Sequence, residues 1–123
     1  MATDRRRLTG TIGELVFDAR ALAQNWTVAK PLIDDGVDRW VRFAPDEGFH
    51  SVQVKTVSRR TDKPGIVRID VRKRNSKKYY DQSELDFWAV VWGSVVWLIP
   101  WVEFSNVRSG VKVNRPEFDK YKI

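Results

Sequence analysis

The fold prediction rests on the heptapeptide His50-Ser51-Val52-Gln53-Val54-Lys55-Thr56. Its polar and apolar residues alternate with the period of two that is typical of a β-strand with one buried face. Gln53 and Lys55 therefore project from one face of the strand, and Val52 and Val54 project from the other. We expect a half-buried strand that presents an amide and an ammonium group together.

This stretch lies in the third of six expected strands, which cover residues 27–32, 37–44, 49–59, 66–72, 85–92 and 95–102. The turn at residues 45–48 predicts that the second and third strands are antiparallel, and Gly93-Ser94 predicts a hairpin between the last two. A short strand within 107–113 and a helix within 103–109 or 116–122 stay open. The pattern of one helix followed by several strands predicts an α+β fold.

One amphipathic helix is predicted before the strands. Thr11 is expected as its N-cap, with Glu14 at the capping-box position three residues later. Residues 1–8 are expected to be a basic flexible arm, and residues 9–123 a single domain. The residues with the three-and-four spacing of a buried helix face are Ile12, Leu15, Val16, Ala19, Leu22, Ala23 and Trp26.

Composition excludes several classes of site. The 123 residues include no cysteine and one histidine, which excludes disulfides, thiolate zinc sites and multi-histidine metal sites. A metal would be held by carboxylates, carbonyls and water, which favours Mg²⁺, with Mn²⁺ as an alternative. No apolar signal core follows the basic N-terminus, and the apolar run 87–102 is interrupted and too short to cross a bilayer. We expect a cytoplasmic protein with no membrane partner.

Four polar residues on successive elements predict a metal-dependent phosphodiesterase site. Asp38, at the start of the second strand, is expected to be the principal metal ligand, with the Gln53 amide oxygen and the Val54 backbone carbonyl as further ligands. Lys55 would stabilise transition-state charge or help to deprotonate water, and Glu14 would complete the outer shell or bind a second ion. The alternative is structural: a capping-box glutamate, a turn aspartate and a solvated strand face.

The formal net charge of +6 suits either a polyanionic partner or simple solubility. Clusters of basic residues favour contact with a DNA backbone, and a neighbouring tyrosine could stack on an unpaired base. Of the two adjacent tyrosines, one is expected to pack in the core beneath the basic loop. The expected nucleic-acid-binding residues are Arg59, Arg60, Arg72, Lys73, Arg74, Lys77, Lys78 and Tyr79.

The order of these residues resembles the PD-(D/E)XK nuclease superfamily. Gly13-Glu14 lies in a helix, Val37-Asp38 precedes a strand, and Gln53-Val54-Lys55 lies on the next strand. The chain is most similar to small single-domain members in which glutamine replaces the second acid, such as bacterial intron-encoded homing endonucleases. Archaeal-type Holliday junction resolvases are similar more distantly. The resemblance covers roughly residues 9–101.

The resemblance implies a restriction-endonuclease-like core with a mixed sheet, magnesium-dependent DNA cleavage and a homo-oligomer, either a dimer or a tetramer. It implies that Glu14, Asp38, Gln53 and Lys55 form the catalytic set. Because Gln53 replaces an acid, the metal site loses a formal charge. Two other functions stay open: a nuclease-fold module that binds DNA without cutting it, and a protein-interaction domain that assembles through the apolar hairpin 87–102.

Overall fold

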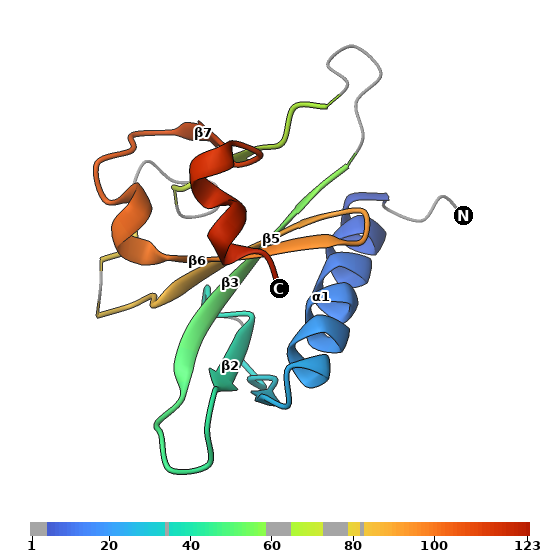
Figure 1. Ribbon diagram of the computed structural model, residues 1–123, viewed down its shortest axis with the longest axis vertical. Coiled ribbons are helices and arrows are strands. Elements are labelled where there is room, and N and C mark those ends of the chain that lie inside the picture. The colour runs from blue at the N-terminus through green and yellow to red at the C-terminus, as the bar shows by residue number, and fades with distance from the viewer. Residues whose placement is uncertain (1–4, 34, 59–64, 73–78, 82) are drawn as a thin grey trace.

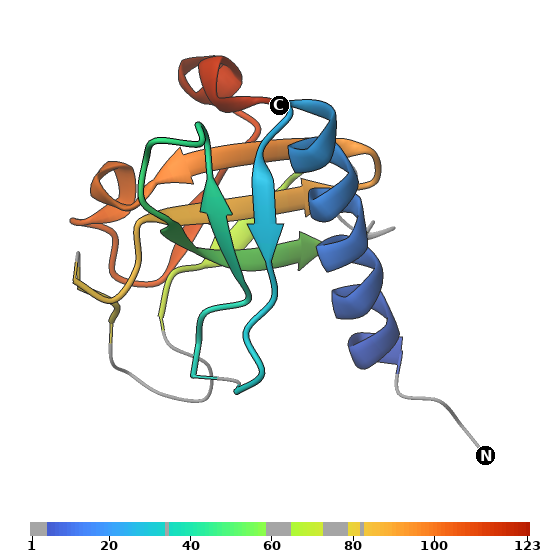
Figure 2. The same cartoon turned by 90° about the horizontal axis from the view of Figure 1, so that it is seen from below.

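The computed structural model describes residues 5–33, 35–58, 65–72, 79–81 and 83–123. A five-stranded mixed sheet carries one long helix on one face, and a second, two-stranded sheet packs on the other (Figure 1). In Figure 2 the helix (blue) crosses the direction of the three long strands of the main sheet and runs alongside the first strand (cyan). The α+β prediction is therefore confirmed, including the N-terminal helix packed on a mixed sheet.

No helix within the described residues is both long enough and apolar enough to cross a membrane.

The elements follow one another along the chain as one long helix, seven strands and two short 3₁₀ helices within the described residues. The bounds are α1 (Arg5–Ala23), β1 (Thr27–Ala29), β2 (Arg39–Arg42), β3 (His50–Val57), β4 (Arg68–Asp70), β5 (Phe87–Trp92), β6 (Val95–Pro100), the 3₁₀ helix η1 (Trp101–Phe104), β7 (Gly110–Lys112) and the 3₁₀ helix η2 (Pro116–Tyr121).

Strand order in the main sheet is β1-β2-β3-β5-β6. The two predicted hairpins are confirmed, since β2 pairs antiparallel with β3 and β5 pairs antiparallel with β6. Between them, β3 and β5 are parallel, so the sheet is mixed. Strand β4 leaves this sheet and pairs with β7, which confirms a short strand near the C-terminus. The C-terminal helices that stayed open in the sequence are single 3₁₀ segments.

The sheet separates two apolar clusters. On the α1 face, Phe17 and Ala21 pack against Val52 and Val54 of β3. On the opposite face, Val67, Ile69 and Val71 of the β4 segment, together with both 3₁₀ helices, cover Trp88 and Trp97 and their neighbours. Burial on two sides explains why β5 and β6 are continuously apolar rather than alternating.

The N-terminal prediction is wrong in two respects. Within the described residues α1 begins at Arg5, so residues 5–8 are helical rather than part of a flexible arm. Thr11 lies in the interior of the helix and is no N-cap, which also removes the capping-box role considered for Glu14. At the other end, Asn25 adopts a positive φ of 63° just beyond the last turn of the helix.

The buried face of α1 also differs from the prediction. Ile12, Leu15 and Leu22 are 58%, 59% and 59% exposed, whereas Gly13, Phe17 and Ala21 are buried. The reason is the close approach of Gly13 to β3. A β-carbon at Gly13 would overlap the Thr56 hydroxyl and lie 2.7 Å from Thr56 Cβ. A glycine contributes nothing to an apolar pattern, so the spacing of large residues indicated a face that is largely wrong. Of the predicted residues, Val16 and Trp26 are half-buried against the cluster on the α1 face.

The β5–β6 hairpin belongs to the core. Trp88 and Trp97 are 2% and 1% exposed, and Val90, Val96 and Ile99 are fully buried. The large apolar side chains of this hairpin are thus used inside the domain, and the hypothesis that residues 87–102 form an interaction surface gains no support from them.

Candidate active site

Gln53 and Lys55 lie on the face of β3 that is opposite to α1. In the parallel ladder Gln53 pairs with Trp88 and Lys55 with Val90, and both partners belong to the cluster beneath the β4–β7 sheet. Val52 and Val54 instead face α1. Both polar side chains are half-buried. The predicted alternation along β3 is confirmed, and it places the amide and the ammonium group on the same surface.

Asp38 lies against β3 just before β2 begins. Its backbone N–H donates to Val52 O at 2.9 Å, although Arg39 is the register partner of Val52. Asp38 and Arg39 thus both lie opposite Val52, as two residues lie opposite one in a β-bulge. A bulge can change the direction in which a side chain points. The Asp38 carboxylate accepts a hydrogen bond from Val54 N–H at 2.8 Å. The acid is therefore held at the residue that separates Gln53 from Lys55.

Tyr80 is a further member of the site that the sequence pattern did not assign. Its hydroxyl lies 3.3 Å from Gln53 Oε1 and 3.3 Å from the carbonyl oxygen of Gly36, two residues before Asp38. The side chain is 8% exposed and packs edge-on against Trp88, with ring centroids 5.5 Å apart. Of the two adjacent tyrosines, Tyr80 is thus the one in the core, while Tyr79 is 39% exposed.

Lys55 lies near an aromatic ring, and its charge interacts with a carboxylate. Its ammonium nitrogen is 5.8 Å from the Trp88 ring centroid, within the range of a cation–π interaction. The hydrogen bond from Arg72 lowers the pKa of Asp70 to about 2, and the charge of Lys55 contributes to that shift. Asp70 on β4 therefore lies near enough to Lys55 for their charges to interact.

Glu14 lies on the other face of the sheet, where it helps to neutralise a buried arginine. Arg39 is 4% exposed and donates to Glu14 Oε1 at 2.8 Å and to both carboxylate oxygens of Asp18. Burial lowers the pKa of Arg39, but the hydrogen bonds and charges of Asp18 and Glu14 outweigh it and raise the pKa. Arg39 Nη1 also donates to the Asp38 carbonyl oxygen at 2.7 Å. Glu14 thus reaches the Asp38 backbone through Arg39 and is not brought to Gln53 or Lys55.

The candidate oxygen donors on and beside β3 would suit a hard cation that keeps much of its water. They are one carboxylate, the Gln53 amide and the Val54 carbonyl, which points to the same side of β3 as the Val54 N–H. Among the described residues there is no group of three acidic or histidine side chains that could hold a metal. The donor set therefore fits Mg²⁺ or Mn²⁺ but carries little negative charge.

Most of the expected nucleic-acid-binding residues lie outside the described part of the chain: Arg59, Arg60, Lys73, Arg74, Lys77 and Lys78. The two described members are close together, since Arg72 and Tyr79 form a β-bridge. Arg72 pairs with Asp70 at 2.5 Å. The Tyr79 hydroxyl donates to Arg108 O at 2.6 Å, and its ring stays partly exposed.

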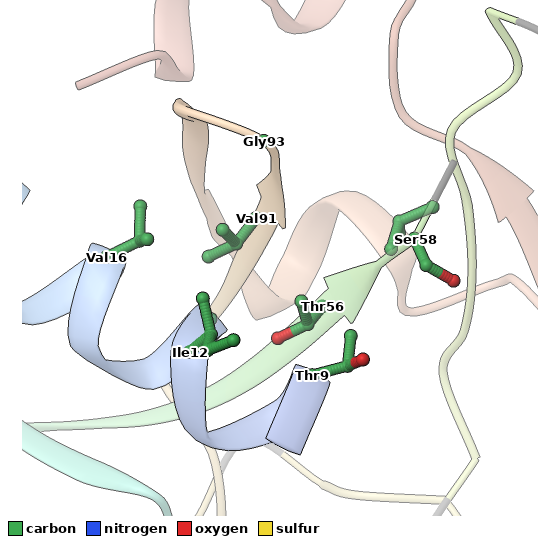
Figure 3. Close-up of a pocket in the computed structure, with 9 residues that line it drawn as sticks. Thr9, Ile12, Val16, Thr56, Ser58, Val91 and Gly93 are labelled. Carbon is green, nitrogen blue, oxygen red and sulfur yellow. The ribbon is translucent and has the colours of Figure 1, made fainter. Parts of the chain in front are cut away.

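A pocket of about 280 Å³ lies on the α1 face and is separate from this site. Figure 3 shows Thr9, Ile12 and Val16 on α1 and Thr56 on β3 around it, with Gly93 in the β5–β6 turn. Its lining is mainly apolar, so it offers no donor set for a metal or a phosphate.

Comparison with solved structures shows a likeness of fold. No family model matches the chain, and no curated protein matches it in sequence. The solved structure of the bacterial homing endonuclease I-Ssp6803I is similar, with a TM-score of 0.75 and 21% sequence identity over 94% of this chain and 87% of the other. At this identity the likeness concerns the fold. The chain has an α+β fold of the type found in a bacterial homing endonuclease.

Proposed function

We propose that the protein is a metal-dependent endonuclease of the PD-(D/E)XK type that hydrolyses DNA phosphodiester bonds. The observation that carries the proposal is the bond between the Asp38 carboxylate and the Val54 N–H. It brings the acid to the point on β3 from which Gln53 and Lys55 project on one face. The fold likeness to a homing endonuclease supports the same reading.

The donors have distinct parts in this chemistry. Asp38, the Gln53 amide oxygen and the Val54 carbonyl would hold Mg²⁺ or Mn²⁺. The cation would supply charge neutralisation at the phosphate and lower the pKa of bound water. Lys55 would approach the non-bridging phosphate oxygens as a fixed positive charge, and the Trp88 ring beneath it restricts its position.

Glu14 enters the proposal in an outer role. Its Oε1 is bonded to Arg39, and Arg39 is bonded to the Asp38 carbonyl oxygen. Through this connection Glu14 would orient the backbone that carries Asp38, in the way that outer-shell partners hold metal ligands in place.

DNA is the proposed polyanionic partner. The net charge of +6 favours it, and the solved neighbour is a homing endonuclease. A specific duplex site and a branched junction both suit the proposal. Arg72 and Tyr79 would lie at the edge of the bound DNA, together with Arg59, Arg60, Lys73, Arg74, Lys77 and Lys78.

We further propose that the protein acts as a homo-oligomer, a dimer or a tetramer. The support is the outward face of α1, where Leu8, Ile12, Leu15 and Leu22 are each about half exposed or more. A second copy of the helix could cover this row. Light scattering of the wild type and of Leu15→Glu tests it: the wild type should exceed the mass of one chain, and the variant should not.

A cleavage assay tests the enzyme proposal. Labelled plasmid, four-way junction, flap and single-stranded DNA are incubated with Mg²⁺, Mn²⁺ or EDTA. Asp38→Ala and Lys55→Ala should abolish metal-dependent cutting, whereas Lys112→Ala, an exposed lysine on β7, should cut as the wild type does. Cutting that survives in both site variants would contradict the proposal.

A second function has its own support, which is DNA binding without cleavage. Gln53 stands where an acid would add charge, and the described residues contain no three-member acidic cluster. Tight binding that weakens steeply with salt, with no cutting by the wild type in any metal, would favour this function. Under the endonuclease proposal Asp38→Ala abolishes cleavage and, when measured in EDTA, leaves DNA binding largely intact.

A further inference from the structure

The hydroxyl of Tyr80 lies near two hydrogen-bond acceptors but has only one hydrogen to donate. It lies 3.3 Å from the carbonyl oxygen of Gly36 and 3.3 Å from Gln53 Oε1, and both of these atoms accept hydrogen bonds. A phenol donates one hydrogen and can also accept one. If the Gln53 amide is turned over, its Nε2 donates to the Tyr80 oxygen and Tyr80 donates to Gly36. Both contacts are then satisfied.

The surroundings hold the hydroxyl in place. The Tyr80 ring packs against Trp88, and the Tyr80 carbonyl accepts a hydrogen bond from Trp101 Nε1 at 2.8 Å. On the other side, Gly36 has a φ of +97°, and a β-carbon there would lie 2.9 Å from the hydroxyl oxygen. Glycine at this position allows the backbone carbonyl to reach Tyr80.

The orientation of the amide decides whether Gln53 can be a metal ligand. A carboxylate presents an oxygen whichever way it is turned, whereas an amide presents its oxygen in only one of two orientations. A site that has glutamine in place of an acid therefore needs a group that selects the orientation. An acceptor on one side of the amide does this, because it binds Nε2 and leaves Oε1 on the opposite side.

We propose that Tyr80 is a positioning residue for Gln53. Its hydroxyl, anchored on the Gly36 carbonyl, accepts a hydrogen bond from Gln53 Nε2 and so turns the amide oxygen away from Tyr80, toward the metal that Asp38 would share. The metal part of this inference rests on the proposed function. The contact between Tyr80 and Gln53 does not, and it can be measured without metal or DNA.

The first test is NMR of the Gln53 side-chain amide in the metal-free protein, assigned by its loss in Gln53→Ala. In Tyr80→Phe, the Nε2 proton that faces residue 80 should move upfield and exchange faster with solvent. The control is Tyr121→Phe, which removes the hydrogen bond from that hydroxyl to Glu103 and should leave the Gln53 signals unchanged. Unchanged Gln53 signals in Tyr80→Phe would overturn the proposal.

The second test is calorimetric titration with Mn²⁺ alone. Tyr80→Phe should weaken binding by on the order of tenfold, as loss of an outer-shell partner does, while Tyr121→Phe binds as the wild type. In a Gln53→Ala background Tyr80→Phe should have no further effect. An equal loss in both backgrounds would show that Tyr80 acts through general structure and would overturn the inference. A wild type that binds no Mn²⁺, either alone or with DNA present, would refute the proposed enzyme, while the amide signals still decide the Tyr80 contact.

Discussion

Replacing Gly13 by alanine should have two opposite effects on the unfolding free energy. The higher helix propensity of alanine would raise it, and the close contact between Gly13 and Thr56 would lower it. Gly10 and Gly13 both lie inside α1. Replacing a glycine in a helix interior by alanine stabilises the helix by about 1 kcal/mol. At Gly10 a new β-carbon meets nothing within 4 Å, so Gly10→Ala should give that gain in full.

At Gly13 the same substitution places a methyl group inside β3. The new carbon would overlap the Thr56 hydroxyl, and a change of Thr56 rotamer can remove that overlap. It cannot remove the 2.7 Å approach to Thr56 Cβ, because that atom is fixed by the strand backbone and ordinary contacts begin at 3.4 Å. The helix must therefore retreat by more than half an ångström, and Phe17 and Ala21 move with it.

The difference between the two variants isolates this overlap, because both gain the same propensity. Overpacking costs about 1–3 kcal/mol, and the fixed β-carbon suggests the upper part of that range. Urea unfolding with an unchanged m-value measures it. Gly13→Ala should unfold at a lower urea concentration than the wild type, and Gly10→Ala at a higher one. If the two variants unfold at the same concentration, the account of helix placement is refuted.

Three further predictions concern charges around the site. Arg39→Met should cost about 3 kcal/mol in unfolding free energy, near the lower end for buried ion pairs because Glu14 and Asp18 keep about a quarter of their side-chain surface exposed. Arg115→Met, which breaks an exposed pair with Glu117, is the control and should change stability by less than about 1 kcal/mol; equal losses would contradict the burial argument. The lowered pKa of Asp70 means that its pairing with Arg72 stabilises the fold above about pH 4 and that this contribution is lost as the pH falls through 2. Asp70→Asn should therefore lower stability slightly at pH 6 and not at pH 2, and a loss of equal size at both values would argue against the ion pair. Gln53→Glu should tighten Mn²⁺ binding roughly tenfold in calorimetry, because it adds a charged ligand; unchanged affinity would mean that residue 53 does not face the metal.

Sequence patterns predicted the parts of the fold that depend on local alternation. The two faces of β3 and both hairpins follow from residue spacing and turn chemistry. The buried face of α1 could not be predicted from residue spacing, because the contact of α1 with β3 is centred on Gly13, which has no side chain. Strand β4 has the same alternation whether it joins the main sheet or pairs with β7, so its partner could not be predicted from sequence.

The candidate site was predicted in part for similar reasons. Asp38 precedes β2, and Gln53 and Lys55 lie on β3, the next strand of the same hairpin. The turn between the two strands predicts that they pair, so the sequence could predict that these residues come close together. The partner of Glu14 is Arg39, whose burial depends on how α1 crosses the sheet. Tyr80 and Gln53 are 27 positions apart in the sequence, so their contact could not be predicted from a local sequence pattern.

Under the proposed function, glutamine rather than an acid at position 53 would have opposite effects on the two ligands of the site, the metal and DNA. With Asp38 and Lys55 as its charged groups, the surface of β3 is close to neutral, whereas a second carboxylate would make it negative. A neutral surface repels a phosphodiester less than a negative one does, and it holds a divalent cation less firmly. DNA that brings its own phosphate charge to the site would then supply the missing ligand charge. Metal affinity should therefore rise when DNA is bound, and by linkage DNA affinity should rise with Mg²⁺ or Mn²⁺. In Gln53→Glu the site carries its own charge, so this mutual dependence should become weaker.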